Sequence, residues 1–402
     1  MRSSEVRNML AVTQRPDIIS FAGGLPDTRA FPCDHIAKAT ERVMARCGHS
    51  ALQYGPSEGH PGLKEFLVEL MKEEGIDVGL DDFIVTDGGQ QALELLAKVF
   101  IGTGDAIVVE GPSYVGAVQA FSGYEPNYVL VPLDENGLVV DELEEKLALL
   151  DDEGIRPKFL YTVPNFHNPA GVTMSLERRK KLVKLAEEHD LLIIEDNPYG
   201  WLRYSGEHFP TLRSMSENVI YVSTLSKIFS PGMRLGWVVA PKPILEKLVF
   251  AKQAADLCTS SFTQLVAEEY FRSFPWRDHL ANLIKMYRER RNAMLSALEE
   301  FMPKGTTWTK PDGGLFVWAS LPEAIDTGEM LAEAVQKAKV AYISGRAFYP
   351  DESGKNSMRL NFSFCEEGII MVGIERLSEV VKEKIALYES FFRNKEASRL
   401  EE

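Results

Sequence analysis

The chain has 402 residues, of which 45% are hydrophobic and 26% charged, as in ordinary soluble globular enzymes. This length exceeds the size at which a single core usually stops growing, so we expect two domains. The net charge of −15 argues against nucleic acid or an anionic membrane surface as a partner, so any phosphate site must be a local construction.

Short apolar strands alternate with helical patterns between about residues 63 and 240. The predicted strands are Phe83–Thr86, Ala106–Val109, Tyr128–Val131, Phe159–Val163, Leu191–Glu195, Val219–Ser223 and Leu235–Ala240. Helical patterns at Gln90–Phe100, Leu176–His189 and Ile244–Asp256 lie between the strands or follow them. This alternation predicts an α/β fold with a mostly parallel, seven-stranded sheet between helices.

The pattern changes after about Pro275. A long charged helix, His279–Phe301, leads to strands at Leu315–Ala319 and Met358–Phe362 and to a terminal helix, which predicts a smaller α+β domain. We therefore expect an N-terminal helix or arm at residues 1–40 that packs on the small domain. A large domain at residues 41–278 and a small C-terminal domain at residues 279–402 follow.

Two segments are placed to bring backbone close to a ligand. Phe21–Pro26 contains a glycine turn that either lets backbone approach a ligand or simply turns. Thr86–Gln91 follows a strand and opens a helix, and the free N–H groups of a helix start form a ready anion site. An ordinary strand-to-helix turn has the same pattern.

Tyr114, after the next strand, has two interpretations. Its ring either stacks on a planar ligand ring or fills the core.

Polar side chains follow two further buried strands. Asn168 precedes Pro169 in a turn after Phe159–Val163, where its amide can face the carboxyl edge of the sheet, although Asn-Pro is also a plain turn dipeptide. Asp196 would point into the crevice, where a buried carboxylate needs a cation such as a pyridinium nitrogen. If that pyridinium ring also carries a phenolic oxygen, Tyr199 could donate a hydrogen bond to it. The alternative for Asp196 is the capping of a local turn.

Lys227 follows the apolar run Val219–Ser223 and small hydroxyl residues, and Arg234 comes soon after it. An amine and an arginine there suit a cofactor that is both an aldehyde and a phosphate, which is pyridoxal phosphate. Taken alone, Lys227 could be a solvated surface residue. However, Asn168, Asp196 and Lys227 all fall at the carboxyl ends of parallel strands, where open α/β sheets bind ligands. Together they predict a pyridoxal phosphate site.

Arg359 lies within an apolar, alternating strand, where a guanidinium needs an anion. The α-carboxylate of an amino acid could supply this anion through a bidentate pair, and a structural ion pair is the alternative.

The four cysteines and seven histidines are scattered, which predicts reduced thiols in a cytoplasmic protein and no metal site. The sequence shows neither a signal peptide nor an apolar run that could span a bilayer.

These segments together resemble the fold-type I pyridoxal-phosphate aminotransferases, and within them the branch of 2-aminoadipate and kynurenine aminotransferases. The resemblance extends over nearly the whole chain, from about Ser3 to the C-terminal helix. Its most specific parts are Phe21–Pro26, Leu52–Gly59, Pro112–Tyr114, Asn168–Gly171 and Ser226–Arg234.

The resemblance implies a role for each matching cofactor residue. Lys227 would be the Schiff-base lysine and the proton shuttle, Asp196 would pair with the pyridine nitrogen, and Tyr114 would stack on the ring. Asn168 and Tyr199 would bond the phenolic oxygen of the ring. The phosphate would lie among Gly89, Gln90, Thr224, Ser226 and Arg234.

The remaining implied residues concern the substrate and a second subunit. Tyr54 would reach the phosphate of the neighbouring subunit, which makes the active unit a homodimer with shared active sites. Arg359 would hold the substrate α-carboxylate, with Asn168 beside it and Gly24 nearby. Arg7, on the N-terminal helix, would recognise an acidic substrate side chain.

The implied reaction is ping-pong transamination through a Schiff base on Lys227. The amino group would pass from 2-aminoadipate, glutamate or an aromatic or branched-chain L-amino acid to a 2-oxo acid such as 2-oxoglutarate. A β-lyase or decarboxylase on the same fold is one alternative. A non-catalytic regulator that binds the cofactor is another, although only about twenty residues precede Phe21 and the charge is acidic.

Overall fold

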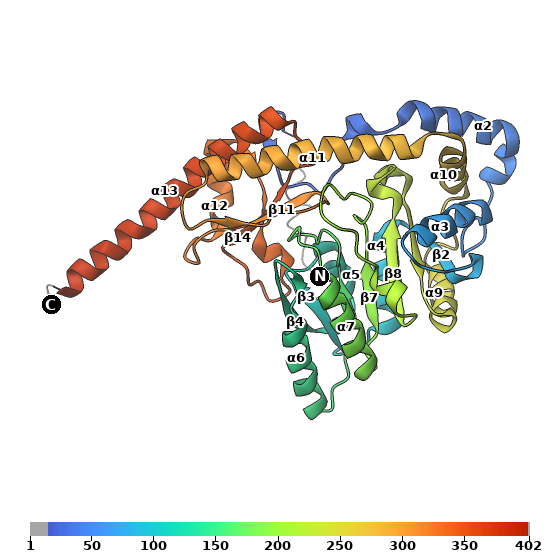
Figure 1. The fold of residues 1–402 in the computed structure, drawn as a ribbon, viewed down its shortest axis with the longest axis horizontal. Coiled ribbons are helices and arrows are strands. Elements are labelled where there is room, and N and C mark those ends of the chain that lie inside the picture. Colours follow the sequence, from blue (N-terminus) through green and yellow to red (C-terminus); the bar gives the residue numbers. More distant parts are fainter. Residues whose placement is uncertain (1–14, 401–402) are drawn as a thin grey trace.

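The structure is a computed structural model that describes residues 15–400, with side chains described up to residue 390. It is an α/β protein with a large, mostly parallel sheet and a smaller C-terminal domain, as the sequence predicts. The long helix α11 (Trp276–Phe301) runs across the molecule and joins the two parts, while the end of α13 (Glu367–Leu400) projects away from the body (Figure 1).

The large sheet has the strand order β2-β9-β8-β7-β6-β3-β4-β5. Its strands are β2 (Phe83–Asp87), β3 (Ala106–Gly111), β4 (Asn127–Asp134), β5 (Gly137–Leu138), β6 (Leu160–Thr162), β7 (Ile193–Asp196), β8 (Val219–Thr224) and β9 (Leu235–Val239). The strands from β8 to β4 run parallel to one another, and β9 runs antiparallel to both of its neighbours. Because all five parallel strands point the same way, their carboxyl ends meet at one edge.

The sheet has eight strands where we predicted seven. All seven predicted strands are present, with ends that differ by at most three residues. The additional strand, β5, pairs antiparallel with the end of β4 through Leu133 opposite Leu138. A strand of two residues is too short to show an alternating pattern in the sequence, so this hairpin was missed.

Helices cover both faces of the large sheet. On one face the apolar sides of α4 (Gly88–Phe100), α5 (Val115–Ser122) and α9 (Lys242–Ala255) pack on the sheet. On the other face lie α6 (Val140–Asp152), α7 (Leu176–Glu188) and the short α8 (Leu212–Met215). This double coverage explains why the central strands are apolar on both sides.

The smaller domain is built around a four-stranded antiparallel sheet. Its strands, in the order β10-β11-β14-β13, are β10 (Thr307–Trp308), β11 (Phe316–Ser320), β14 (Ser357–Asn361) and β13 (Ile343–Ser344). The helices α12 (Thr327–Glu333) and α13 pack beside it. The N-terminal strand β1 (Ile19–Ser20) pairs with β12 (Val340–Ala341), which ties the start of the described chain to this domain.

Further helices lie outside the two sheets. Helix α2 (Cys33–Ala51) and helix α3 (Pro61–Glu73) both pack against α10 (Ser261–Ser273). The predicted domain boundaries at residues 40 and 278 fall inside α2 and α11, and they stay predictions.

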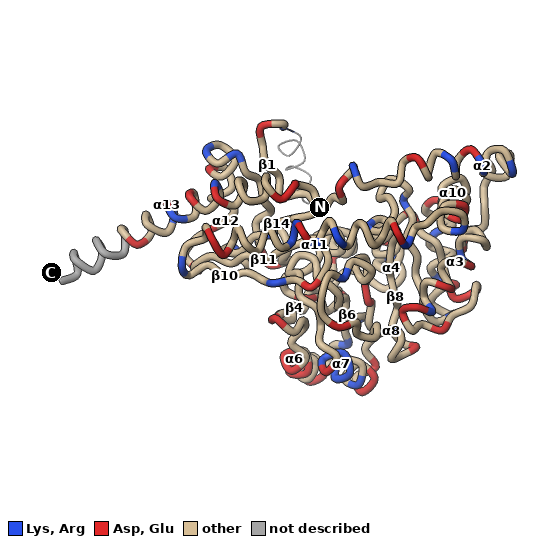
Figure 2. Tube along the Cα trace, turned by 45° about the horizontal axis from the view of Figure 1, so that its top comes forward, with Lys and Arg blue, Asp and Glu red and all other residues tan. Residues whose placement is uncertain are grey.

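Acidic residues gather on α6 and basic residues on the neighbouring α7, as Figure 2 shows. Lys181 of α7, for example, pairs with Asp141 and Glu144 of α6.

All four cysteines are free. Among the described helices, none combines the length and the apolar character needed to cross a membrane.

A buried ion pair fixes the segment that follows the N-terminal glycine turn. Asp27 is 2% exposed and accepts a hydrogen bond of 2.6 Å from Arg290 of α11, which is 4% exposed. Arg29 donates to the same carboxylate. Burial acts to raise the pKa of Asp27, but the hydrogen bonds from Arg29 and Arg290 outweigh it and lower the pKa to about 2. The N-terminal segment is thereby attached to the helix that joins the two domains.

Asp27→Asn is expected to reduce the free energy of unfolding at pH 7 by about 3–5 kcal/mol, because it leaves the buried Arg290 without its carboxylate. Since the pKa of Asp27 is lowered, its stabilisation is present above the usual value of 3.8 and is lost as the pH falls through 3.8 toward 2. Urea unfolding at several pH values measures both effects. Asp17→Asn, which removes an exposed pair with Arg15, is the matched control and should change little. Equal losses in the two variants would contradict the prediction.

Candidate active site

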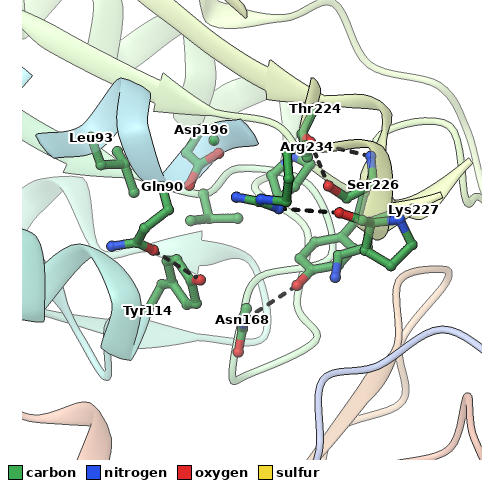
Figure 3. Close-up of a pocket in the computed structure, with 14 residues that line it drawn as sticks. Gln90, Leu93, Tyr114, Asn168, Asp196, Thr224, Ser226, Lys227 and Arg234 are labelled. Carbon is green, nitrogen blue, oxygen red and sulfur yellow. Dashed lines mark hydrogen bonds between the residues drawn. The ribbon is translucent and has the colours of Figure 1, made fainter. Parts of the chain in front are cut away.

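A pocket opens at the carboxyl edge of the large sheet (Figure 3). Its lining comes from the ends of β6, β7 and β8, from the start of α4 and from the residue before α5. The lining residues are Gly89, Gln90, Leu93, Tyr114, Val163, Asn168, Asp196, Pro198, Tyr199, Thr224, Ser226, Lys227, Pro231 and Arg234. Ten of the fourteen predicted site residues are among them, although these ten are spread over 146 positions of the sequence.

One end of the pocket gathers groups that attract an anion. Thr224 and Ser226 have their hydroxyl oxygens 2.8 Å apart, and Arg234 lies beside them in Figure 3. Arg234 Nη2 donates to the carbonyl of Asp87 at 2.9 Å, just before α4 begins. Gly88 has a φ of +75°, and a Cβ there would lie 2.4 Å from Arg234 Nη2, so glycine lets the helix start and the guanidinium meet.

Asp196 is a buried carboxylate that forms no ion pair with any described residue. It is 6% exposed, and its Oδ2 accepts a hydrogen bond of 2.7 Å from the hydroxyl of Tyr161. Burial raises the pKa of Asp196 to about 7, against the opposing effect of Tyr161. The carboxylate therefore accepts its hydrogen bond from a side chain on β6. A cap on a local turn, the alternative drawn from the sequence, is not found among the described residues. A cation that enters the pocket would relieve its cost of burial.

Asn168 connects two other predicted residues. Its Nδ2 donates to the hydroxyl of Tyr199 at 3.2 Å, and its Oδ1 accepts from Arg359 Nη1 at 2.9 Å. Arg359 Nη2 also donates to the carbonyl of Ala22 at 2.7 Å. The orientation of the Asn168 amide is set by these two partners, because only its nitrogen can donate and only its oxygen can accept.

Arg359 is a buried cation without an anion. The residue is 2% exposed, and within the described part of the chain no carboxylate pairs with it. The rings of Phe316 and Phe348 lie 4.3 and 5.0 Å from its guanidinium carbon, and Nε has no hydrogen-bond partner. Burial lowers the pKa of Arg359 to about 10. A structural ion pair, the alternative drawn from the sequence, is therefore not found among the described residues.

Lys227 lies in the pocket and not on the open surface. Its Nζ donates to the carbonyl of Gly24 at 3.2 Å and lies 6.0 Å from the centre of the Tyr199 ring. Burial and the positive charges of Arg359 and Arg234 lower the pKa of Lys227 to about 8. A substantial fraction of the amine is therefore neutral near physiological pH, as a nucleophile or a general base requires.

Tyr114 borders the pocket at the start of α5. Its hydroxyl lies 3.4 Å from Gln90 Oε1, and Gln90 Nε2 donates to the carbonyl of Gly116 at 2.7 Å. A Cβ on Gly116 would lie 2.4 Å from the Tyr114 ring, so the ring packs closely on the backbone. Burial raises the pKa of Tyr114.

Four predicted residues are not among the residues that line this pocket. Arg359 and Gly24 adjoin it, since Arg359 donates to Asn168 and Lys227 donates to the carbonyl of Gly24. Tyr54 is 77% exposed and does not line it in the single chain. Arg7 falls outside the described residues, so its predicted role stays a prediction.

The sequence profile of the family described as "Aminotransferase class I and II" matches residues 16–377. The chain belongs to this family. It is therefore a transaminase, and the match covers most of both domains and every described residue of the candidate site.

Three relatives show how similar this aminotransferase is to characterised members. The aromatic-amino-acid aminotransferase 1 of Thermococcus litoralis is 49% identical over 96% of this chain and 93% of its own length. The solved structure of a kynurenine aminotransferase from Pyrococcus horikoshii is 47% identical, covers 96% of this chain and 95% of that one, and has a TM-score of 0.92. The alpha-aminoadipate aminotransferase of Thermus thermophilus is 36% identical, covers 96% of each chain and has a TM-score of 0.89. The predicted branch is thereby confirmed.

Pyridoxal 5′-phosphate is the cofactor of this aminotransferase. The Thermus structure carries N-(5′-phosphopyridoxyl)-L-leucine, and the Pyrococcus structure carries the pyridoxamine form. The pocket fits the group on its own chemistry. An anion site at the start of α4, a buried carboxylate without a cation at Asp196 and an amine at Lys227 match its phosphate, ring nitrogen and aldehyde.

Several residues of the aminotransferase site were missed from the sequence. Tyr161 was seen only as part of a strand, and its contact with Asp196 depends on the register of β6 against β7. Phe316 and Phe348, which flank Arg359, belong to two other segments of the small domain, and nothing in the sequence marks them as its neighbours. The apolar lining residues Leu93 and Val163 carry no signal that separates them from other core residues.

Proposed function

We propose that this aminotransferase moves the α-amino group of an L-amino acid to a 2-oxo acid such as 2-oxoglutarate, in two half-reactions at one site. The donors would be acidic, such as 2-aminoadipate or glutamate, or aromatic or branched. The observation that carries the proposal is the buried guanidinium of Arg359, which has no carboxylate partner among the described residues. It bonds the carbonyl of Ala22, while Lys227 bonds that of Gly24 in the same segment.

Each residue would then have a distinct task at the reacting carbon. The bound cofactor supplies an aldehyde that accepts the amino group and a ring that takes up the electron pair left at Cα. Lys227 holds the cofactor until the substrate amine replaces it, and its freed amine then removes the Cα proton. The pKa of about 8 supports this task. Arg359 binds the α-carboxylate with two parallel hydrogen bonds, which orients Cα, and Gly24 lies beside it.

The other predicted residues would hold the cofactor. Asp196 pairs with the ring nitrogen, Tyr114 stacks on the ring, and Asn168 and Tyr199 bond the phenolic oxygen. The start of α4 at Gly89 and Gln90, with Thr224, Ser226 and Arg234, binds the phosphate.

We also propose a homodimer in which Tyr54 reaches the phosphate site of the partner. Large apolar side chains that the single chain leaves exposed support an interface there. They include Leu25, Leu52, Tyr54, Phe250 and Leu257, which are 45–77% exposed. The cytoplasmic location expected from the cysteines stays a prediction.

An absorbance titration of the purified holoenzyme tests the proposed reaction. Addition of L-2-aminoadipate without any oxo acid should replace the yellow band of the bound aldehyde by the near-ultraviolet band of pyridoxamine phosphate. L-phenylalanine and L-leucine, titrated in the same way, rank the donor classes. The D-enantiomers are the control and should leave the yellow band unchanged.

The same titration separates the alternatives. A β-lyase would keep the yellow band with all three amino acids, because none of them carries a leaving group on Cβ, and would release pyruvate and ammonia only from an amino acid that does. A decarboxylase would release carbon dioxide. A yellow band that persists with all three L-amino acids would contradict the proposed donors.

A further inference from the structure

Tyr161 and Asp196 form a buried pair that none of the proposed tasks has used. Tyr161 lies on β6 opposite Ile194 of β7, so its side chain shares a face with Ile194 and with Asp196 two residues further on. Its side chain is fully buried, and its ring packs edge-on against Phe121 at a centroid distance of 5.5 Å. The hydroxyl donates to Asp196 Oδ2 at 2.7 Å. The donor is therefore held in place by the sheet and the core, and not by the ligand.

We propose that Tyr161 is a positioning residue, whose hydroxyl fixes the carboxylate of Asp196 and keeps it ionised toward the ring nitrogen of the cofactor. This inference rests on the proposed function of Asp196. No other described residue donates a hydrogen bond to this carboxylate, so Oδ2 is occupied by Tyr161 and Oδ1 is left for the ligand. One bound oxygen also prevents the carboxylate from rotating about its Cβ–Cγ bond.

The charges around Asp196 make this one hydrogen bond important. Burial raises the pKa of Asp196, the negative charge of Glu110 on β3 raises it further, and Tyr161 alone is found to lower it. The other ionisable groups that interact with it, Tyr114 and Tyr199, are neutral phenols with raised pKa values. The pKa of Tyr161 is itself well above 10, mainly through burial, so its hydroxyl keeps its proton as a donor.

Removal of the hydroxyl should shift a proton from the ring nitrogen to the carboxylate. Without its donor, the carboxylate is a stronger base in a site that already penalises its charge. The ring nitrogen would then carry its proton less often, and the ring would be a weaker acceptor for the electron pair at Cα. The substrate carboxylate site at Arg359 is not in contact with Tyr161, so substrate binding should change little.

Tyr161→Phe of the holoenzyme tests the proposal with two readouts. The ¹⁵N chemical shift of the ring nitrogen, measured with ¹⁵N-labelled pyridoxal phosphate, should move toward the value of an unprotonated pyridine. In the first half-reaction the rate constant at saturating L-phenylalanine should fall about tenfold to hundredfold, with the half-saturating concentration changed less than about threefold.

Tyr342→Phe is the matched control, because it also removes a fully buried hydroxyl that donates to a carbonyl, at Thr327 in the small domain. It should leave the ¹⁵N shift and the rate unchanged. A ¹⁵N shift in Tyr161→Phe equal to that of the wild type would overturn the inference, as would equal effects of the two substitutions. If the wild type fails to transaminate, the proposed function fails, but the ¹⁵N shift still decides whether Tyr161 acts on the ring nitrogen.

Discussion

Replacing Lys227 with alanine is expected to reduce the turnover of amino acid and 2-oxo acid by about five orders of magnitude. The pocket lining offers no second amine, because its only other basic side chain is the guanidinium of Arg234. That guanidinium forms hydrogen bonds to two backbone carbonyls. No other side chain of the lining can therefore form the covalent link to the cofactor or remove the Cα proton. Steady-state and single-turnover kinetics with the same amino acid measure the loss.

Lys227→Arg is the control that separates amine chemistry from charge. It keeps a cation at this position but cannot lose its proton, so it should be as inactive as the alanine variant. Added methylamine should restore part of the proton transfer in Lys227→Ala, because the space of the missing side chain is open, and should restore less in Lys227→Arg. Turnover within about tenfold of the wild type in Lys227→Ala would refute the assignment.

The pH dependence of cofactor uptake gives a further check on Lys227. Since burial and two neighbouring cations lower the pKa of its amine to about 8, the neutral amine predominates above that pH and the ammonium form below it. The rate at which the wild-type apoprotein takes up pyridoxal phosphate should therefore rise with pH, reach half of its maximum near pH 8 and level off above that pH. A rate that keeps rising toward pH 10 would indicate an unperturbed lysine.

The parts of the site that follow from single segments could be predicted from the sequence. A buried β-branched run defines a strand such as β8, and the position of Lys227 just beyond it places the amine at the carboxyl edge. Because parallel strands end at the same edge, Asn168 and Asp196 could be placed near Lys227 without knowledge of any contact. The structure brings all three residues together in the lining of one pocket.

The parts that depend on register or on distant segments could not be predicted. Tyr161 meets Asp196 only because β6 pairs with β7 in one register, and a shift of one residue would turn its hydroxyl to the other face. Arg359 contacts the carbonyl of Ala22 across 337 positions of the chain. The sequence shows that such an arginine needs a partner, but it does not show which backbone and which rings surround it.

Arg359→Met is expected to lower kcat/KM for L-amino acids by at least about a hundredfold. The reason is the loss of two charge-assisted hydrogen bonds to the α-carboxylate in a site where the guanidinium has no competing anion among the described residues. The guanidinium is also fixed before the substrate arrives, by Asn168, by the carbonyl of Ala22 and by two rings. Little freedom is lost on binding, so most of the interaction energy is available to orient Cα over Lys227.

The comparison of L-phenylalanine with 2-phenylethylamine isolates the carboxylate, because the two compounds differ only in that group. The wild type should strongly prefer phenylalanine, and Arg359→Met should slow phenylalanine while leaving the amine nearly unchanged. The amine rate also reports whether the variant is folded and loaded with cofactor. The rate of Arg359→Lys with phenylalanine should lie between the rates of the wild type and of Arg359→Met. An ammonium keeps the charge but cannot form the planar pair of two hydrogen bonds. If Arg359→Met slowed both compounds equally, Arg359 would act through the fold or the cofactor and not through the substrate carboxylate.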